Sequence, residues 1–411
     1  MPSLFPRPLR RRNFVLYFTG QITSNTGVWF QNLALSLWIV ETTESARALS
    51  LVTVCQFAPI LLLSGPAGAV ADRFRARPVL LATAALSALC ASALAFAAGT
   101  DGGRLPVLLG IVAVGGVVQA FERTVGQAFL FELVGAQELG AAVSLNTVAM
   151  SAARSIGPGL AGIAYATVGP AACFAINAGS YSFAIVALCL MSSKSFEHRR
   201  VRRSRGVEGS VRSLLAEKNL RRLFAANIAV TVLAMNFMVV VTAMVTLTLG
   251  GGPAQLGAAH ALNAVGAVIG GLVISMAPST RLRTTAIATA VLGIALGCAA
   301  ASPNIIFYLA VSPLIGVGLG AFQSSLNSTV QTIGPPHLLG RSAALLTMTS
   351  VGVAPIGAVV AGTIVDGASA RLAMVLGTLT CLVCGAVLDR GARPPRSRTP
   401  TAAEPHAARA D

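Results

Sequence analysis

The sequence contains few charged residues for its length. Of its 411 residues, 11% are Asp, Glu, Lys or Arg, whereas a soluble domain carries about a quarter. Hydrophobic residues make up 55% of the chain, the mean hydropathy is +0.75, and the charges are clustered between long uncharged stretches. Because a bilayer-spanning helix takes about 20 mostly apolar residues, this composition excludes a water-soluble globular protein and predicts an integral membrane protein.

The sequence also lacks the motifs of most enzymes and pumps. It has no phosphate-binding Gly-x-x-x-x-Gly-Lys-Ser/Thr segment, no paired histidine ligands and no nucleophile elbow. All seven cysteines lie in apolar segments, and the pair Cys381 and Cys384 has no second pair or histidine partner. We therefore expect no metal and no cofactor, and neither a membrane enzyme nor an ATP-driven pump.

Uncharged apolar runs predict twelve transmembrane helices in two groups of six. The expected helices are 14–40, 47–70, 79–99, 105–124, 138–166, 170–191, 222–249, 255–277, 284–302, 305–327, 340–365 and 370–388. The corresponding division of the chain is a cytoplasmic N-terminal segment (1–13), a six-helix bundle (14–191), a basic cytoplasmic linker (192–221), a second bundle (222–388) and a disordered cytoplasmic tail (389–411).

The positive charges predict the orientation. With the N-terminus in the cytoplasm, all of the 30 Lys and Arg residues fall on the cytoplasmic side except Arg47, Arg104 and Arg371 outside and Arg154 within a span. We expect a multi-pass protein of the inner (plasma) membrane with both termini cytoplasmic and no cleavable signal peptide. Because topology alone accounts for the basic linker, the net charge of +16 does not indicate a nucleic acid partner; contact with anionic lipid would be an addition.

A weak internal repeat relates the two groups of helices. Among the residues that coincide when the halves are aligned are Gly157 with Gly357, and Gly162 with Gly362. The fifth and eleventh helices therefore correspond, which predicts an all-α protein built from two pseudosymmetric six-helix bundles. Rocking of one such bundle against the other alternates access to a site at the membrane midplane.

The segment between the second and third helices resembles a loop of the major facilitator superfamily. Gly68-Ala-Val-Ala-Asp72-Arg73-Phe-Arg75-Ala-Arg77 is similar to its Gly-x-x-x-Asp-Arg-x-Gly-Arg-Arg pattern, although Arg75 replaces a glycine and Ala76 an arginine. The resemblance implies a transporter with a gating charge relay whose arginine is Arg75 or Arg77. Glu122 and Arg123, expected near the cytoplasmic end of the fourth helix, are predicted members of the same cluster.

The fifth helix resembles the Gly-Pro-x-x-Gly-Gly signature of exporters and antiporters in this superfamily. The matching residues are Gly157, Pro158 and Gly162, with Ala161 in place of one glycine. Proline kinks a membrane helix and glycine permits close helix contact. The opening Asn13 to Gln21 and the segment Phe57-Ala-Pro59 are similar to the branch that includes the enterobactin and macrolide efflux transporters, which implies export.

Arg154 is the main candidate for a substrate contact, because a charge deep in a span costs on the order of 3 kcal/mol unless it faces a cavity or a partner. Polar residues in other spans complete the expected cavity, although each could instead form an interhelical hydrogen bond. They are Gln21, Asn25, Asn32, Asn146, Asn227, Asn236, Asn263, Gln323 and Asn327. His260 is a possible proton site or a packing residue, and no carboxylate falls clearly at mid-membrane.

These observations favour a proton-coupled exporter of a small, partly hydrophobic compound of the drug, macrolide or siderophore type. It would work by alternating access in the lipid bilayer, as a monomer. Two alternatives remain open at this point: an importer of a nutrient or metabolite with the same fold, and a transport-inactive receptor or structural subunit.

Overall fold

The structure is a computed structural model that describes residues 7–100, 104–192, 214, 216–277, 282–334 and 338–392. Within these residues the chain is almost entirely helical and has no strand. Most of the expected linker and the expected tail from residue 393 onward lie outside the described residues. The prediction of an all-α membrane protein is confirmed.

The first half contains six spans. After the short helix η1 (Arg7–Arg10) come α1 (Arg12–Thr43), the bent pair α2 (Ala46–Leu62) and α3 (Ser64–Arg73), α4 (Ala76–Gly99) and the long α5 (Leu105–Cys189). Gly135 and Gly169 divide α5 into a first (105–135), a second (137–168) and a third segment (170–189), since both have positive φ angles (71° and 76°) that favour glycine.

The second half repeats this layout. It consists of α7 (Lys218–Leu233), α8 (Phe237–Ala243), η3 (Met244–Thr248), α9 (Pro253–Ser275), α10 (Leu282–Ala300), α11 (Ile305–Ile333), α12 (Leu339–Thr347), η5 (Met348–Gly352), α13 (Ala354–Gly367) and α14 (Ala370–Ala392). The breaks η3 and η5 are π-helical turns within the seventh and eleventh spans. Nine helices of the described chain are long and apolar enough to cross a membrane, and the pair α2 and α3, bent by 52°, makes a tenth. The 32-residue α1 and the break at Gly169 complete the twelve predicted spans.

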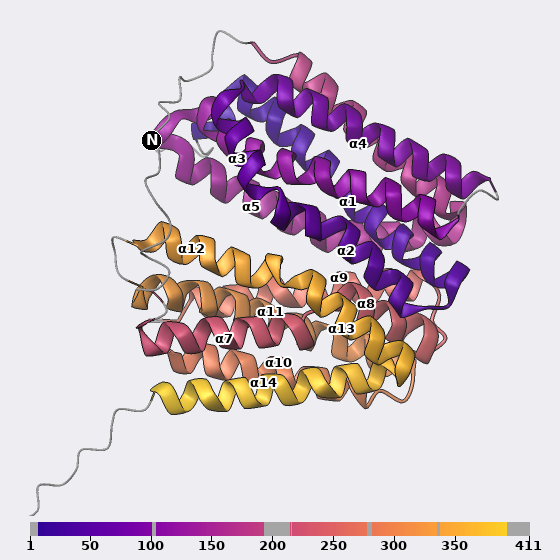
Figure 1. The fold of residues 1–411 in the computed structure, drawn as a ribbon, viewed down its shortest axis with the longest axis vertical. Coiled ribbons are helices and arrows are strands. Elements are labelled where there is room, and N and C mark those ends of the chain that lie inside the picture. The colour runs from indigo at the N-terminus through magenta and orange to yellow at the C-terminus, as the bar shows by residue number, and fades with distance from the viewer. Residues whose placement is uncertain are drawn as a thin grey trace, which may run out of the picture.

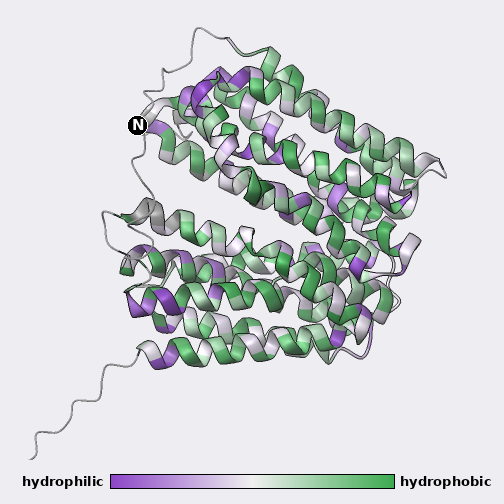
Figure 2. Cartoon of the chain, viewed as in Figure 1, coloured by the Kyte–Doolittle hydropathy of each residue, from purple (hydrophilic) through white to green (hydrophobic). Residues whose placement is uncertain are grey.

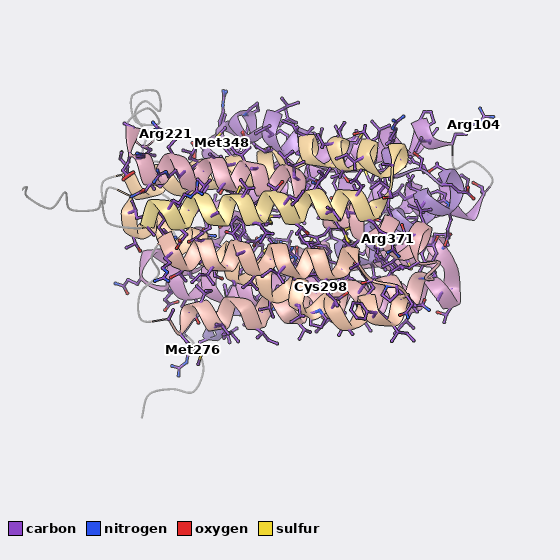
Figure 3. The ribbon with its side chains drawn as sticks, turned by 90° about the horizontal axis from the view of Figure 1, so that it is seen from below. Arg104, Arg221, Met276, Cys298, Met348 and Arg371 are labelled. Carbon is purple, nitrogen blue, oxygen red and sulfur yellow. The ribbon has the colours of Figure 1, made fainter. Side chains whose placement is uncertain are left out.

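The two halves lie side by side and diverge toward one end (Figure 1). Helices α1 to α5 form one bundle and α7 to α14 the other. Because α1 begins and α14 ends at the same end of the molecule, we call it the terminal end and the opposite one the far end. Apolar residues predominate along the helices (Figure 2). Arg221 and Met276 lie at the terminal end and Arg104 at the far end (Figure 3).

Close helix contacts at equivalent glycines reproduce the repeat seen in the sequence. A Cβ built on Gly157 would meet α1, and one on Gly357 would meet α7. Further along the same spans, a Cβ on Gly162 would meet α9, and one on Gly362 would meet α2. The fifth and eleventh spans therefore each contact the first helix of their own half and the second helix of the other half.

One helix boundary differs from the prediction in a way that affects the site. The first segment of α5 runs to Gly135, whereas the fourth span was expected to end at residue 124. The helix continues through Glu122, whose side chain is half-buried within the bundle. The charged residue therefore does not mark the end of the helix. Glu122 and Arg123 consequently lie near the middle of the span. Smaller differences are the start of α7 at Lys218 and the end of α14 at Ala392.

Candidate functional site

Arg154 lies near the middle of the second segment of α5 and is held against α1. Its guanidinium carbon is 5.7 Å from the centroid of the Trp29 ring, a cation–π contact. The side chain is exposed, and no carboxylate pairs with it among the described residues. The guanidinium is therefore positioned by an aromatic face and keeps its hydrogen-bond donors available.

His260 approaches Arg154 from the other half of the molecule. It lies on α9, within electrostatic reach of Arg154, and its Nε2 atom is buried with no hydrogen-bond partner among the described residues. The second segment of α5 and α9 touch through Gly159 and Gly162, close to Ala261 and Gly257. Arg154, Trp29 and His260, which we call the interface site, thus combine a fixed cation, an aromatic face and an imidazole where the two halves meet.

The α1 amides expected in the cavity form hydrogen bonds within the first half. Asn25 Nδ2 donates to Gln21 Oε1 at 3.3 Å, and Gln56 Nε2 donates to Asn32 Oδ1 at 2.9 Å. Asn146 lies one turn from Met150, with Nδ2 3.8 Å from the sulfur. The bond between Gln56 and Asn32 joins two helices, which is the alternative that the sequence left open, whereas the other two contacts lie within one helix.

The expected cavity residues of the second half are engaged in a similar way. Asn227 donates to the hydroxyls of Thr349 and Ser350, both at 2.9 Å. Asn236 Nδ2 donates to the Val232 carbonyl at 2.6 Å, next to the break between α7 and α8. Further along, Asn327 Nδ2 donates to the backbone carbonyl of Gln323 at 3.0 Å. Asn263 is half-buried on α9, where its backbone carbonyl faces Gly316 of α11.

At the far end, Asp366 connects the halves. The carboxylate at the end of α13 accepts hydrogen bonds from the Ser45 hydroxyl (2.7 Å) and the backbone amides of Ala46 (2.7 Å) and Arg47 (3.1 Å). These groups form the start of α2, so an acid from the second half caps a helix N-terminus in the first. The far-end latch, as we call Asp366 with Ser45 to Arg47, favours a closed far end.

Replacing Asp366 with alanine is expected to open the far end more often. A helix cap contributes about 0.5–2 kcal/mol, so the closed population should fall by roughly 2- to 30-fold relative to the open one. Ser50 is 3% exposed at this interface, and a cysteine there, in a cysteine-free background, should react faster with a membrane-impermeant maleimide. Asp389→Asn is the control, because Asp389 pairs with Arg283 inside one half (3.7 Å); equal labelling in both variants would contradict the latch.

At the terminal end, the predicted gating loop connects helices of the first half. Arg73 is the last residue of α3, Arg75 precedes α4, and Arg77 Nη2 donates to the Cys189 carbonyl at 2.9 Å, which joins α4 to the end of the third segment of α5. Gly68 lies in an open place, since a Cβ there would meet no atom of the described chain within 4 Å.

Glu122 and Arg123 do not join this loop, contrary to the prediction. Glu122 lies well inside the first segment of α5, which continues to Gly135, and it lines a cavity inside the first half together with Tyr17, Gln21 and Tyr181. Arg123 is exposed. The prediction placed both at a helix end because charged residues usually mark one.

The glycines of the fifth span make the close contacts that the sequence predicted for them. A Cβ on Gly157 would lie 2.7 Å from Trp29 Cβ, and one on Gly162 would lie 2.6 Å from the Pro253 carbonyl oxygen. Pro158 stands between them within α5. Ala161, which replaces a glycine of the exporter pattern, is fully buried, so its methyl group is accommodated.

Sequence reasoning missed several residues of these contacts. The sequence did not single out Trp29, Gly257 and Asp366. Each of them contacts a helix that is distant in the sequence, and only the fold shows which helices meet. A usable signal existed for Asp366, an acid at the very end of an otherwise uncharged span. Tyr181, which lines the cavity beside Glu122, gave only the weaker signal of a polar group in an apolar run.

Comparison with known proteins gives the family. The profile of the transmembrane secretion effector family matches residues 5–407. The chain is 24% identical over 390 residues to the multidrug efflux pump Tap of Mycolicibacterium fortuitum, covering 92% of this chain and 95% of that protein. It is also 30% identical over 181 residues to the staphyloferrin A transporter of Staphylococcus aureus, covering 42% and 44%.

A solved structure shows the same fold. A point mutant of the nucleoside transporter NupG superposes with a TM-score of 0.73 over 92% of this chain and 99% of that one, at 9% sequence identity. The predicted resemblance to the major facilitator superfamily is therefore confirmed, and the chain belongs to its transmembrane secretion effector family, a family of membrane transporters rather than enzymes.

Proposed function

We propose that this protein exports a small, partly hydrophobic compound from the cytoplasm in exchange for protons, by alternating access. The observation that carries the proposal is the interface site, where Arg154, held against Trp29 in one half, lies within electrostatic reach of His260 in the other. A ligand bound between two rigid halves contacts both of them, so it can favour one arrangement of the halves over another.

The positive-inside rule assigns the terminal end to the cytoplasm. Basic side chains such as Arg11, Arg73 and Arg221 lie there, whereas the far end has Arg47, Arg104 and Arg371. The contacts between the halves described above lie toward the far end, at Asp366 and at Gly162. On this assignment the conformation is closed to the outside and ready to receive a compound from the cytoplasm.

The chemistry of the interface site favours a substrate with an aromatic or apolar body and an anionic oxygen. The Arg154 guanidinium offers donors suited to a carboxylate, and no acid of the described chain occupies them. The unpartnered Nε2 of His260 adds a second polar contact. We therefore assign His260, first considered as a proton site, to the substrate. The names of two relatives, a multidrug efflux pump and a staphyloferrin A transporter, support a cargo of drug or siderophore size.

The proposal is tested with purified protein in liposomes, using carboxyfluorescein as an anionic aromatic probe and ethidium as a cationic one. With the terminal end facing outward, an interior more acidic than the bath should drive carboxyfluorescein into the vesicles, and a protonophore should abolish this accumulation. Ethidium should accumulate less. Equal accumulation with and without the proton gradient would contradict proton coupling, and movement only in the opposite direction would indicate an importer.

A further inference from the structure

The interior of the first half contains a partly polar cavity separate from the interface site. This small cavity, with room for about one water molecule, lies between α1, α4 and the first and third segments of α5. Its polar lining consists of Tyr17, Gln21, Ser24, Glu122 and Tyr181, while α4 contributes only the apolar Leu80 and Ala84. A site of this polarity and size can hold ordered water.

Glu122 is the one carboxylate that lines this cavity. It lies close to the midpoint of the helix 105–135, beside Gln21 and Leu80 in the terminal-end halves of α1 and α4. No hydrogen bond or ion pair of its carboxylate is formed within the described chain. The adjacent Arg123 projects from a different face of the helix but lies within electrostatic reach of Glu122. An acid inside a membrane span is a functional site by default.

A second, more polar cavity lies next to the first. Tyr181 borders both cavities. Gln119, one helical turn before Glu122, lines it together with Gln31, Gln56 and Ser87. The Gln119 Oε1 atom is buried and has no partner among the described residues, so it can accept a hydrogen bond from water. Polar groups therefore extend from Glu122 toward the far end within a single bundle.

We propose that Glu122 binds the coupling proton, in the interior of the first half and apart from the substrate at Arg154. This inference rests on the proposed proton-coupled export. The proton enters from outside, converts the carboxylate to the neutral acid, and leaves to the cytoplasm when the carboxylate forms again. The groups that face Glu122 are the hydroxyls of Tyr17, Ser24 and Tyr181 and the amide of Gln21, and each can hydrogen-bond either form of the acid.

Helix α1 provides the physical link between the two sites. One part of it, Tyr17 to Ser24, lines the Glu122 cavity, and Trp29 stacks on Arg154 a few residues further along the same helix. Gain or loss of the Glu122 charge changes the electrostatic field at Tyr17 and Gln21 of α1, and α1 positions the aromatic wall of the interface site. Proton binding and substrate binding can therefore influence each other without sharing a residue.

The test compares Glu122→Gln, which cannot change its charge, with Glu122→Asp and with the control Glu44→Gln, an exposed acid at the far end of α1. Each is reconstituted in liposomes with carboxyfluorescein. Two rates are measured: accumulation driven by a pH gradient, and exchange of labelled for unlabelled dye without a gradient. Glu122→Gln should lose accumulation at least tenfold while retaining exchange. Glu122→Asp should retain part of the accumulation and Glu44→Gln all of it.

Several outcomes would overturn the assignment. If Glu122→Gln accumulates dye as the wild type does, the proton binds elsewhere. If Glu122→Gln and Glu122→Asp lose exchange together with accumulation, the residue is required for substrate movement or for folding, and the proton assignment is wrong. A wild-type protein that exchanges dye but never responds to a pH gradient would instead refute the proposed function itself, so the two failures are distinguishable.

Discussion

Replacing Arg154 with alanine is expected to raise the carboxyfluorescein concentration for half-maximal transport by roughly tenfold to a hundredfold. A hydrogen bond to a charged group contributes about 1.5–3 kcal/mol, and about 1.4 kcal/mol corresponds to a factor of ten. The guanidinium is held against Trp29 at 5.7 Å, and no other basic residue occupies the same part of α5. The measurement is initial dye uptake into liposomes as a function of dye concentration.

Two further variants separate the charge of Arg154 from its shape. Arg154→Lys keeps the charge but loses the planar group that stacks on Trp29 and binds a carboxylate through two donors, so its effect should be intermediate. Arg104→Ala removes an exposed arginine at the far end and should leave transport unchanged. Full transport by Arg154→Ala would show that the interface site does not bind the dye.

The second large effect is expected from Gly162→Leu. Any side chain at Gly162 would place its Cβ 2.6 Å from the Pro253 carbonyl oxygen and 2.9 Å from the Gly257 backbone. These are backbone atoms of α9, so the two helices must separate. Overpacking costs about 1–3 kcal/mol, which should shift the equilibrium by roughly 5- to 150-fold away from the far-end closed arrangement and slow net transport strongly.

The readout for Gly162→Leu is the reactivity of the Ser50→Cys reporter toward a maleimide applied from the far side. Ser50 is buried against Gly362 in the closed arrangement, so labelling should accelerate when the far end opens. Gly179→Ala, on the same long helix, is the matched control, because a Cβ there meets nothing within 4 Å. Unchanged labelling in Gly162→Leu would mean that this contact does not determine closure.

The sequence predicted the spans because the bilayer imposes a long apolar run on each of them. It also predicted the relation between the halves, since Gly157 and Gly162 make contacts equivalent to those of Gly357 and Gly362. Arg154 was identifiable because an uncompensated charge in a span is costly. These signals are local or periodic, and they can be read without knowing which helices touch.

What the sequence did not predict depends on which helices meet. Asp366 and the helix start that it caps lie near opposite ends of the sequence, and no local pattern gives that pairing. Glu122 was placed at a helix end because two consecutive charged residues, Glu122 and Arg123, interrupt the apolar run there, yet the helix continues and Glu122 lines a cavity inside the bundle. Most of the amides assigned to the substrate cavity bond within their own half, because a polar group in a membrane protein has few other partners.

The central claim is that the two halves rock about the interface site, and the most direct test is a pair of distances measured by pulsed electron paramagnetic resonance. Spin labels at Glu44 and Ala368 report on the far end, and labels at Phe74 and Lys218 on the terminal end; all four residues are exposed. When carboxyfluorescein is added at high pH, where the Glu122 carboxylate is charged, the far-end distance should lengthen while the terminal-end distance shortens. Two distances that stay fixed, or that change in the same direction, would contradict alternating access.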